Sequence, residues 1–191
     1  MAKSTRAGKT EVRPRRQEAW SQGGLDGLCG VYSTINALQC LRGKALYEEP
    51  AIAVFKHLVG AIAREFPAVM WEGTSVQNMR DILDRADDYA RAHFGFGVRR
   101  SEPMLRKPPA RNGLYWKRLG ALLDEPRRVL IVGLKDPWEH WSVLTAVTPR
   151  TLRFFDSIGI KVARRAEFSL REGATYRIDP HQVFLLERVE I

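Results

Sequence analysis

A cysteine at the start of an apolar helical pattern is the first candidate for chemistry in this sequence. The segment QGGLDGLCGVYSTINAL, residues 22–38, passes several glycines to reach Cys29 and then repeats apolar residues at helical spacing. A thiolate is the reactive form of cysteine, and the positive end of a helix dipole lowers the pKa of a thiol placed there. Cys29 is therefore predicted to be a nucleophile, with a small buried residue as the alternative. Cys40, at the far end of the same helix, is interpreted as a buried hydrophobe.

A thiol nucleophile needs a base, and His140 is the best placed of the four histidines. It opens an apolar strand pattern directly after the turn-like KDPWE, and functional side chains commonly emerge where a loop enters a strand. The alternative for His140 is a histidine bonded to a backbone carbonyl at a strand start. His57 and His93 fall within helical patterns, and His181 falls in a turn.

A carboxylate that orients this base is predicted at Asp156. With a three-residue turn at 148–150, residue 142 opposes Asp156, which then lies diagonal to His140 on one face of a hairpin. Diagonal neighbours lie about 7 to 8 Å apart at the backbone, so Asp156 can accept a hydrogen bond from the imidazole. The alternative is that Asp156 caps the turn formed by DSIG.

Four further residues complete the candidate site. Gln22 and the backbone N–H of Cys29 would donate to the negative charge that acyl transfer builds on a carbonyl oxygen. Gly27 leaves room for a substrate backbone near the thiol. Trp138 and Trp141 are expected to pack around the histidine and exclude water, or else to be ordinary core residues.

The elements that must position these residues change in kind along the chain. Helices come first and strands follow, which favours an α+β fold with N-terminal helices packed on a C-terminal antiparallel sheet. Residues 1–19 are predicted to be a flexible basic arm, and residues 20–191 a single domain. The expected helices are 30–41, 49–66, a segment from a cap at Thr74 or Ser75 to Gly95, and 114–125; the expected strands are 128–134, 140–147, 151–158 and 182–191, with a loop at 97–113.

The order of these motifs resembles the papain-like cysteine peptidase superfamily: a glutamine, Cys-Gly at a helix start, His-Trp opening a strand, and an aspartate on the next strand. The stretch PRRVLIVGLKDPWEHWSVLTAVTPRTLRFFDSIG is similar to bacteriocin-processing peptidase domains, and the His-Trp pair is also similar to Josephin-type deubiquitinases. The resemblance covers about residues 20 to 158. It implies a papain-like fold in which Cys29 is the nucleophile, His140 the general base and acid, Asp156 the orienting residue and Gln22 the oxyanion donor.

The composition bounds the partners and the compartment. The net charge is +9, yet the basic residues are dispersed and form no nucleic-acid-binding motif, so nucleic acid is not expected as a partner. The charge would steer an acidic partner or substrate toward the surface. No apolar run approaches the roughly 20 residues of a membrane span, so no membrane partner is expected. Two cysteines do not make a disulfide framework, which favours the cytoplasm, and the arginine-rich composition favours a bacterial source.

Together these residues predict a thiol hydrolase that cleaves an amide or peptide bond of a protein or peptide substrate through an acyl-enzyme. If an amine or alcohol replaces water, the same site is an acyltransferase, and glutamine deamidation uses the same chemistry. The rival from another class is a non-catalytic papain-fold binding module. No Cys-x-x-Cys or His-x-x-x-His spacing supports a zinc site, so neither a metal nor another cofactor is expected.

Overall fold

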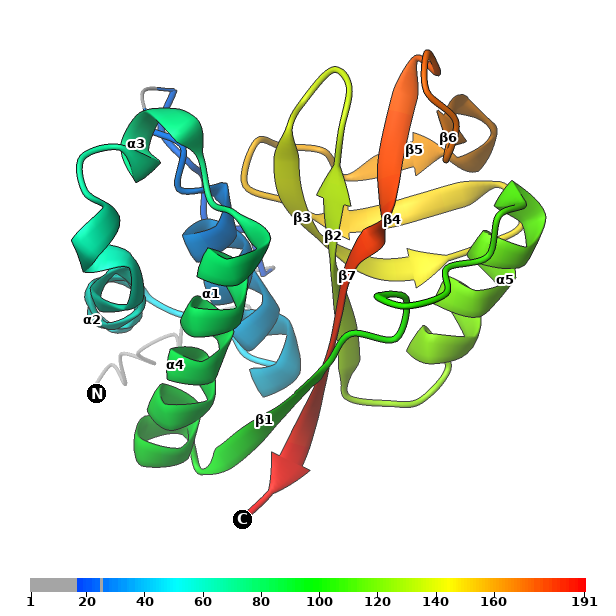
Figure 1. Cartoon of the computed structure of the whole chain (residues 1–191). Coiled ribbons are helices and arrows are strands. Elements are labelled where there is room, and N and C mark those ends of the chain that lie inside the picture. The colour runs from blue at the N-terminus through cyan, green and yellow to red at the C-terminus, as the bar shows by residue number, and fades with distance from the viewer. Residues whose placement is uncertain (1–16, 25) are drawn as a thin grey trace, which may run out of the picture.

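The computed structural model describes residues 17–24 and 26–191, and its helices precede most of its strands (Figure 1). The expected α+β arrangement, with helices packed on an antiparallel sheet, is confirmed. The helices are α1 (Cys29–Arg42), α2 (Glu48–Val59), α3 (Val69–Glu72), α4 (Val76–Phe94) and α5 (Asn112–Leu123), with 3₁₀ turns at Gly60–Glu65 and Arg165–Glu167. The strands are β1 (Phe96–Ser101), β2 (Arg128–Leu134), β3 (His140–Val147), β4 (Thr151–Phe155), β5 (Val162–Arg164), β6 (Phe168–Ser169) and β7 (Tyr176–Glu190).

The described strands form one sheet with a hydrophobic core on each face. The strand order is β1-β7-β2-β3-β4-β5, and β6 pairs with β7 outside this path. Along β2, Val129 and Ile131 join the core beneath α1, α2 and α4, whereas Leu130 and Val132 join the core beneath α5. Because β2 is covered on both faces, its sequence is continuously apolar instead of alternating.

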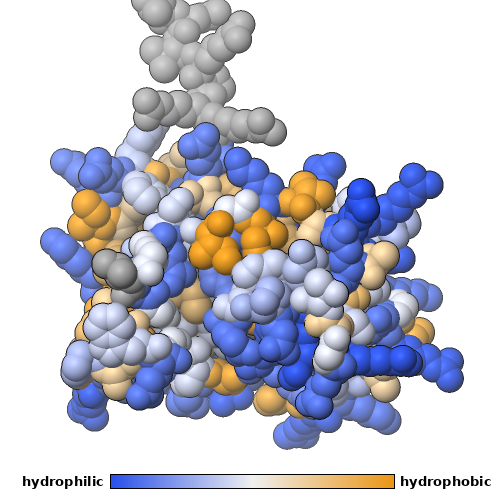
Figure 2. Space-filling view, turned by 90° about the horizontal axis from the view of Figure 1, so that it is seen from above, coloured by the Kyte–Doolittle hydropathy of each residue, from blue (hydrophilic) through white to orange (hydrophobic). Residues whose placement is uncertain are grey.

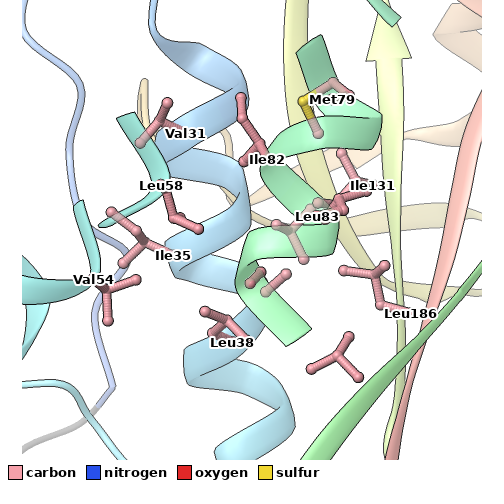
Figure 3. Packing of buried hydrophobic residues seen from close by; sticks show 14 of the residues in the cluster. Val31, Ile35, Leu38, Val54, Leu58, Met79, Ile82, Leu83, Ile131 and Leu186 are labelled. Atoms are coloured by element: carbon pink, nitrogen blue, oxygen red, sulfur yellow. The ribbon is translucent and has the colours of Figure 1, made fainter. Parts of the chain in front are cut away.

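Helix α1 is buried at the centre of the core that α1, α2 and α4 form with one face of the sheet. Figure 3 shows Val31, Ile35 and Leu38 of α1 among apolar side chains of α2 and α4, and none of the three is more than 2% exposed. Burial of each such side chain contributes about 1.5–3 kcal/mol. The helix ends at Gly43, whose φ of 71° lets its N–H bond the carbonyls of the last turn. Apolar packing and this C-terminal cap therefore fix α1 within the core.

Polar side chains inside α1 also hold the segment that precedes it. The Asn36 side chain accepts from the Trp20 N–H at 2.7 Å and donates to the Trp20 carbonyl at 3.1 Å. Gln39 donates to the Glu18 carbonyl at 2.8 Å. Most of the expected arm of residues 1–19 lies outside the described residues, and of its last three residues Glu18 is bonded to α1.

Several segments differ from the expected elements, a helix and a loop most clearly. The helix expected at 49–66 ends as α2 at Val59 and continues only as a 3₁₀ turn. The loop expected at 97–113 was wrong in its first part, which forms β1. The sequence FGVRRS shows no strand alternation, and β1 exists because it pairs along its length with the distant strand β7. The predictions for 128–134 and 140–147 are confirmed with those bounds.

The surface of the described residues is mixed, and some large apolar side chains, such as Trp71 and Tyr47, are exposed. No helix among residues 17–24 and 26–191 is long and apolar enough to cross a membrane. The face seen from above in Figure 2 is mostly hydrophilic, with hydrophobic side chains gathered in small groups. This face therefore presents mainly polar and charged groups to a binding partner.

Gly30 marks the closest approach of α1 to the start of α4, and its replacement tests this packing. A Cβ at Gly30 would lie 2.5 Å from Met79 Sδ and 2.6 Å from Thr74 Oγ1, inside van der Waals contact. We expect Gly30→Ala to lower the free energy of unfolding by about 1–3 kcal/mol through overpacking, measured by urea denaturation.

Gly120 in the middle of α5 is the matched control. A Cβ there meets its nearest neighbour, Val147 Cβ, at an ordinary 3.9 Å. Gly120→Ala should raise the free energy of unfolding by about 0.5–1 kcal/mol, because alanine is the better helix former. Equal effects of the two substitutions would contradict the close packing at Gly30.

Candidate active site

Cys29 is the first residue of α1, and only 6% of its surface is exposed. Burial opposes a charged thiolate, but hydrogen bonds with the His140 side chain, the Trp141 backbone and the Thr74 hydroxyl together lower the pKa of Cys29. The N-terminus of α1 favours the same charge. Cys29 thus combines the three conditions that make a thiol reactive: a helix start, a cationic neighbour and hydroxyl and backbone donors.

Cys40 sits near the opposite end of α1 and has none of these neighbours. It is a free thiol, and burial raises its pKa to about 12. At neutral pH it stays protonated and unreactive.

His140 is the first residue of β3 and is hydrogen-bonded to Asp156. Its Nε2 lies 2.8 Å from Asp156 Oδ2, and both side chains are almost fully buried. Burial opposes a charge on His140, but the hydrogen bonds with Asp156 and Cys29 raise its pKa to about 9. Because Nε2 faces Asp156, Nδ1 is the ring nitrogen left to face Cys29. The imidazole therefore stands between a carboxylate and a thiol, in the charged form at neutral pH.

Asp156 lies just after β4 and uses its two oxygens for different purposes. Oδ2 bonds His140, while Oδ1 accepts from the N–H groups of Ile158 and Ile160 at 2.9 and 3.1 Å. Burial would raise the pKa of Asp156, but the hydrogen bonds from His140 and from the Ile158 N–H lower it. The two alternatives for Asp156, turn cap and partner of the histidine, are both present in one side chain.

The register of the β3–β4 hairpin brings this pair together. Pairing begins at Val147 with Leu152, so the turn is one residue longer than expected. A β-bulge beside Leu144 then takes up one residue of β3, and farther along Val143 opposes Phe155. The register expected from the sequence is therefore restored where the strands reach the histidine and the aspartate.

Two hydrogen bonds hold the helical layer against β3 beside the histidine. Ser33 of α1 donates to the Trp141 carbonyl at 2.5 Å, and Trp141 Nε1 donates to the Thr74 carbonyl at 2.8 Å. All three residues are buried. These two bonds join the helical layer, which carries the thiol, to the strand that carries the imidazole. They therefore help to set the distance between the two groups.

A cleft of about 490 Å³ opens beside Cys29 and His140. The segment around α3 and the start of α4 forms one wall, and the end of β2, the start of β3 and Gln182 of β7 form the other. The charged residues in its lining are Glu65, Glu72, Glu139 and Lys135, and Lys135 is paired with Glu139 at 3.0 Å.

Gln22 and Gly27 are not among the residues that line this cleft. The Gln22 side-chain amide donates to the Asp26 carbonyl, and its backbone N–H donates to the Ser157 carbonyl at 2.9 Å. Gln22 therefore borders the loop that carries Asp156.

Gly27 packs closely against the segment that forms one wall of the cleft. Its N–H donates to the Met70 carbonyl at 2.7 Å, and a Cβ on Gly27 would lie 2.9 Å from the backbone of Gly73. The lack of a side chain at Gly27 therefore allows the segment around Gly73 to pack closely, and the space is not open to a substrate as expected.

The two tryptophans are placed differently. Trp141 lines the cleft next to the histidine. Trp138 does not, and its ring stacks on Tyr176 and Phe168, with centroids 4.6 and 5.9 Å apart, in the core beneath α5. Trp138 therefore anchors the loop before β3 from the opposite face of the sheet.

Thr74 and Ser33 contact the site but were missed at the level of the sequence. The pair Thr74-Ser75 offers two hydroxyls to one helix start, and Ser75 is the residue that caps α4 in a capping box with Asn78. Because Ser75 caps the helix, the Thr74 hydroxyl is not needed for capping. This spare hydroxyl is the only feature of the sequence that could have pointed to Thr74. Ser33 carries no such signal, because its partner is a backbone carbonyl far along the chain.

The described residues contain no group of three His, Cys, Asp or Glu side chains arranged to hold a metal ion. No protein-family model matches the sequence, and no curated protein matches it. Among solved structures, the fold is similar to the peptidase domain of Streptococcus ComA, a bi-functional ABC transporter involved in a quorum-sensing pathway. The TM-score is 0.49 at 11% sequence identity, over 92% of this chain and 100% of the other.

The lowered pKa of Cys29 can be tested by iodoacetamide labelling across pH with peptide mapping. The lowered pKa predicts that Cys29 is labelled at a lower pH than an ordinary thiol, while Cys40, whose pKa is raised, stays unlabelled. His140→Ala removes the facing cation and should slow the labelling of Cys29 by about tenfold or more at a pH below the pKa of an ordinary thiol.

Cys29→Ala is the control, and it should abolish the labelling at low pH. Labelling of Cys29 only at the pH of an ordinary thiol, or equal rates in wild type and His140→Ala, would contradict the ion pair.

Proposed function

We propose that this chain is a papain-like thiol hydrolase that cleaves an amide or peptide bond through Cys29, His140 and Asp156. One observation carries the proposal: a buried imidazole is hydrogen-bonded to a carboxylate at 2.8 Å and lines the same cleft as the thiol at the N-terminus of α1. The imidazole and the thiol each shift the pKa of the other toward the charged form. This arrangement supplies a nucleophile, a proton donor and a group that holds the donor in place. It lies at a cleft open to a substrate.

The reaction follows from the protonation states of the three groups. The Cys29 thiolate attacks the carbonyl carbon, and the His140 imidazolium gives its proton to the leaving amine as the C–N bond breaks. The resulting thioester is attacked by water, whose proton His140 accepts, and the acid is released with the thiolate restored. Asp156 stays charged throughout and stabilises the imidazolium.

Negative charge on the carbonyl oxygen needs donors during both steps. The backbone N–H of Cys29 belongs to the first turn of α1, where N–H groups have no acceptor within the helix, and it points to the same end as the thiol. Gln22 as the second donor stays a prediction. In the structure its amide donates to the Asp26 carbonyl, and Gln22 is not among the residues that line the cleft.

Activity against a library of short peptides and isopeptide-linked substrates tests the proposed function, with the products identified by mass. The rate should rise with pH as Cys29 loses its proton and fall above about pH 9 as His140 loses the proton that the leaving amine needs. Cys29→Ala should remove the activity completely. Chain cleavage supports hydrolysis, deamidation without cleavage supports the deamidase, and transfer to an added amine supports the acyltransferase. Turnover that survives in Cys29→Ala would refute all three.

The charge of the cleft predicts which substrates enter it. Three glutamates and one lysine line the cleft, so its charge is opposite in sign to the +9 of the whole chain. Substrates with lysine or arginine near the scissile bond should therefore have the lower KM. Glu72→Lys should raise KM for such substrates by about three- to tenfold, measured by steady-state kinetics in low salt.

Glu172→Lys is the matched control for this charge reversal. Its side chain is 91% exposed, and it is not among the residues that line the cleft. The same change of two charges there should leave KM unaltered. Equal effects at Glu72 and Glu172 would assign the effect to the total charge of the protein. In that case a surface outside the cleft would select the substrate, and the positive net charge of the chain would favour an acidic substrate there.

A further inference from the structure

Thr74 occupies a position that ordinary helix capping does not explain. It precedes Ser75, which caps α4, so the Thr74 hydroxyl takes no part in the capping box. The residue is 9% exposed and stands over the first turn of α1. Its Oγ1 lies 3.1 Å from the Gly30 nitrogen and 3.6 Å from Cys29 Sγ.

The direction of the hydroxyl proton follows from these two contacts. A hydroxyl has one proton and two lone pairs. The Gly30 N–H can only donate, so Oγ1 accepts from it and uses a lone pair. The proton of Thr74 is then free to point toward Cys29 Sγ, and a thiolate there can only accept.

The surroundings fix Oγ1 in this place. The absence of a side chain at Gly30 creates the space, because a Cβ there would lie 2.6 Å from Oγ1. The Thr74 carbonyl accepts from Trp141 Nε1 at 2.8 Å, which holds the backbone of Thr74 against the strand that carries the histidine. The hydroxyl is therefore positioned before any substrate binds.

We propose that Thr74 is a catalytic residue of this site, whose hydroxyl donates a hydrogen bond to the Cys29 thiolate and stabilises it beside the His140 imidazolium. The inference rests on the proposed function. It adds a group that contacts the nucleophile directly and that comes from the helical layer opposite the histidine. The lowered pKa of Cys29, to which the Thr74 hydrogen bond contributes, agrees with this assignment.

Other charged groups near the thiol stay unchanged when Thr74 is replaced. His140 faces Cys29 from β3 with Asp156 behind it, and the first turn of α1 carries no acidic residue. The remaining charged groups in the cleft lining are Glu65, Glu72, Glu139 and Lys135. A change in the thiol titration on replacing Thr74 therefore reports on the hydroxyl.

The test compares the pH dependence of Cys29 alkylation by iodoacetamide in wild type, Thr74→Val and Thr74→Ser. Valine keeps the shape of threonine and removes the hydroxyl, so the pKa of Cys29 should rise, and alkylation at a pH below the pKa of an ordinary thiol should slow about tenfold. Serine keeps the hydroxyl and should titrate as wild type. Thr74→Ala, which also lacks the hydroxyl, repeats the measurement if the valine variant is poorly folded, and thermal unfolding monitors all variants.

Each outcome separates the hydroxyl from a structural role and from the proposed function. A shift in Thr74→Val or Thr74→Ala that serine restores supports the proposal. A lower melting temperature with an unchanged thiol titration would assign Thr74 to packing alone and overturn it. If wild-type Cys29 titrates as an ordinary thiol, the proposed function fails first, whereas a low wild-type pKa that is insensitive to Thr74 refutes only this inference.

Discussion

The hydrogen bond between His140 Nε2 and Asp156 Oδ2 is the interaction on which the rest of the site depends. Both groups are buried, so the loss of either one would leave the facing atom of the other without its hydrogen-bond partner. The negative charge of Asp156 keeps the proton on His140, and that proton in turn favours the thiolate of Cys29. Asp156 is itself held by the N–H groups of the turn after β4. The turn after β4 therefore positions Asp156, and Asp156 acts through His140 on the charge of the Cys29 thiol in the helical layer.

The thiol and the imidazole come from opposite layers, and the contact between these layers decides how they meet. Ser33 and Thr74 on the helical side bond the backbone and the side chain of Trp141 on the sheet. Gly30 allows the start of α4 to approach the start of α1 closely enough for this. Since no single element carries both reactive groups, a loss of packing between the layers would weaken the site before it unfolded either layer.

Some predictions from the sequence succeeded because the relevant interactions lie within one element or one hairpin. The helix start at Cys29 follows from the apolar spacing after the glycines, and the strand start at His140 from the apolar run after a turn. The placement of Asp156 succeeded for a less direct reason. The turn is longer than expected, and the bulge beside Leu144 compensates, so the final register agrees although its local basis differs. Neither the bulge nor the strand at 96–101 is visible in the local pattern.

The sequence by itself determined the order of helices and strands, the position of Cys29 at a helix start and the alternation that allows Asp156 to reach His140. Periodicity, dipoles and strand alternation act over a few neighbouring residues, and a sequence displays such neighbours directly. Only the tertiary structure decided that the Thr74 hydroxyl faces the thiol and that the Trp138 ring belongs to the opposite core. These features depend on how closely two layers approach and on which backbone groups they leave exposed to one another. Such distances arise from the packing of residues that are remote in the chain, so no local pattern encodes them.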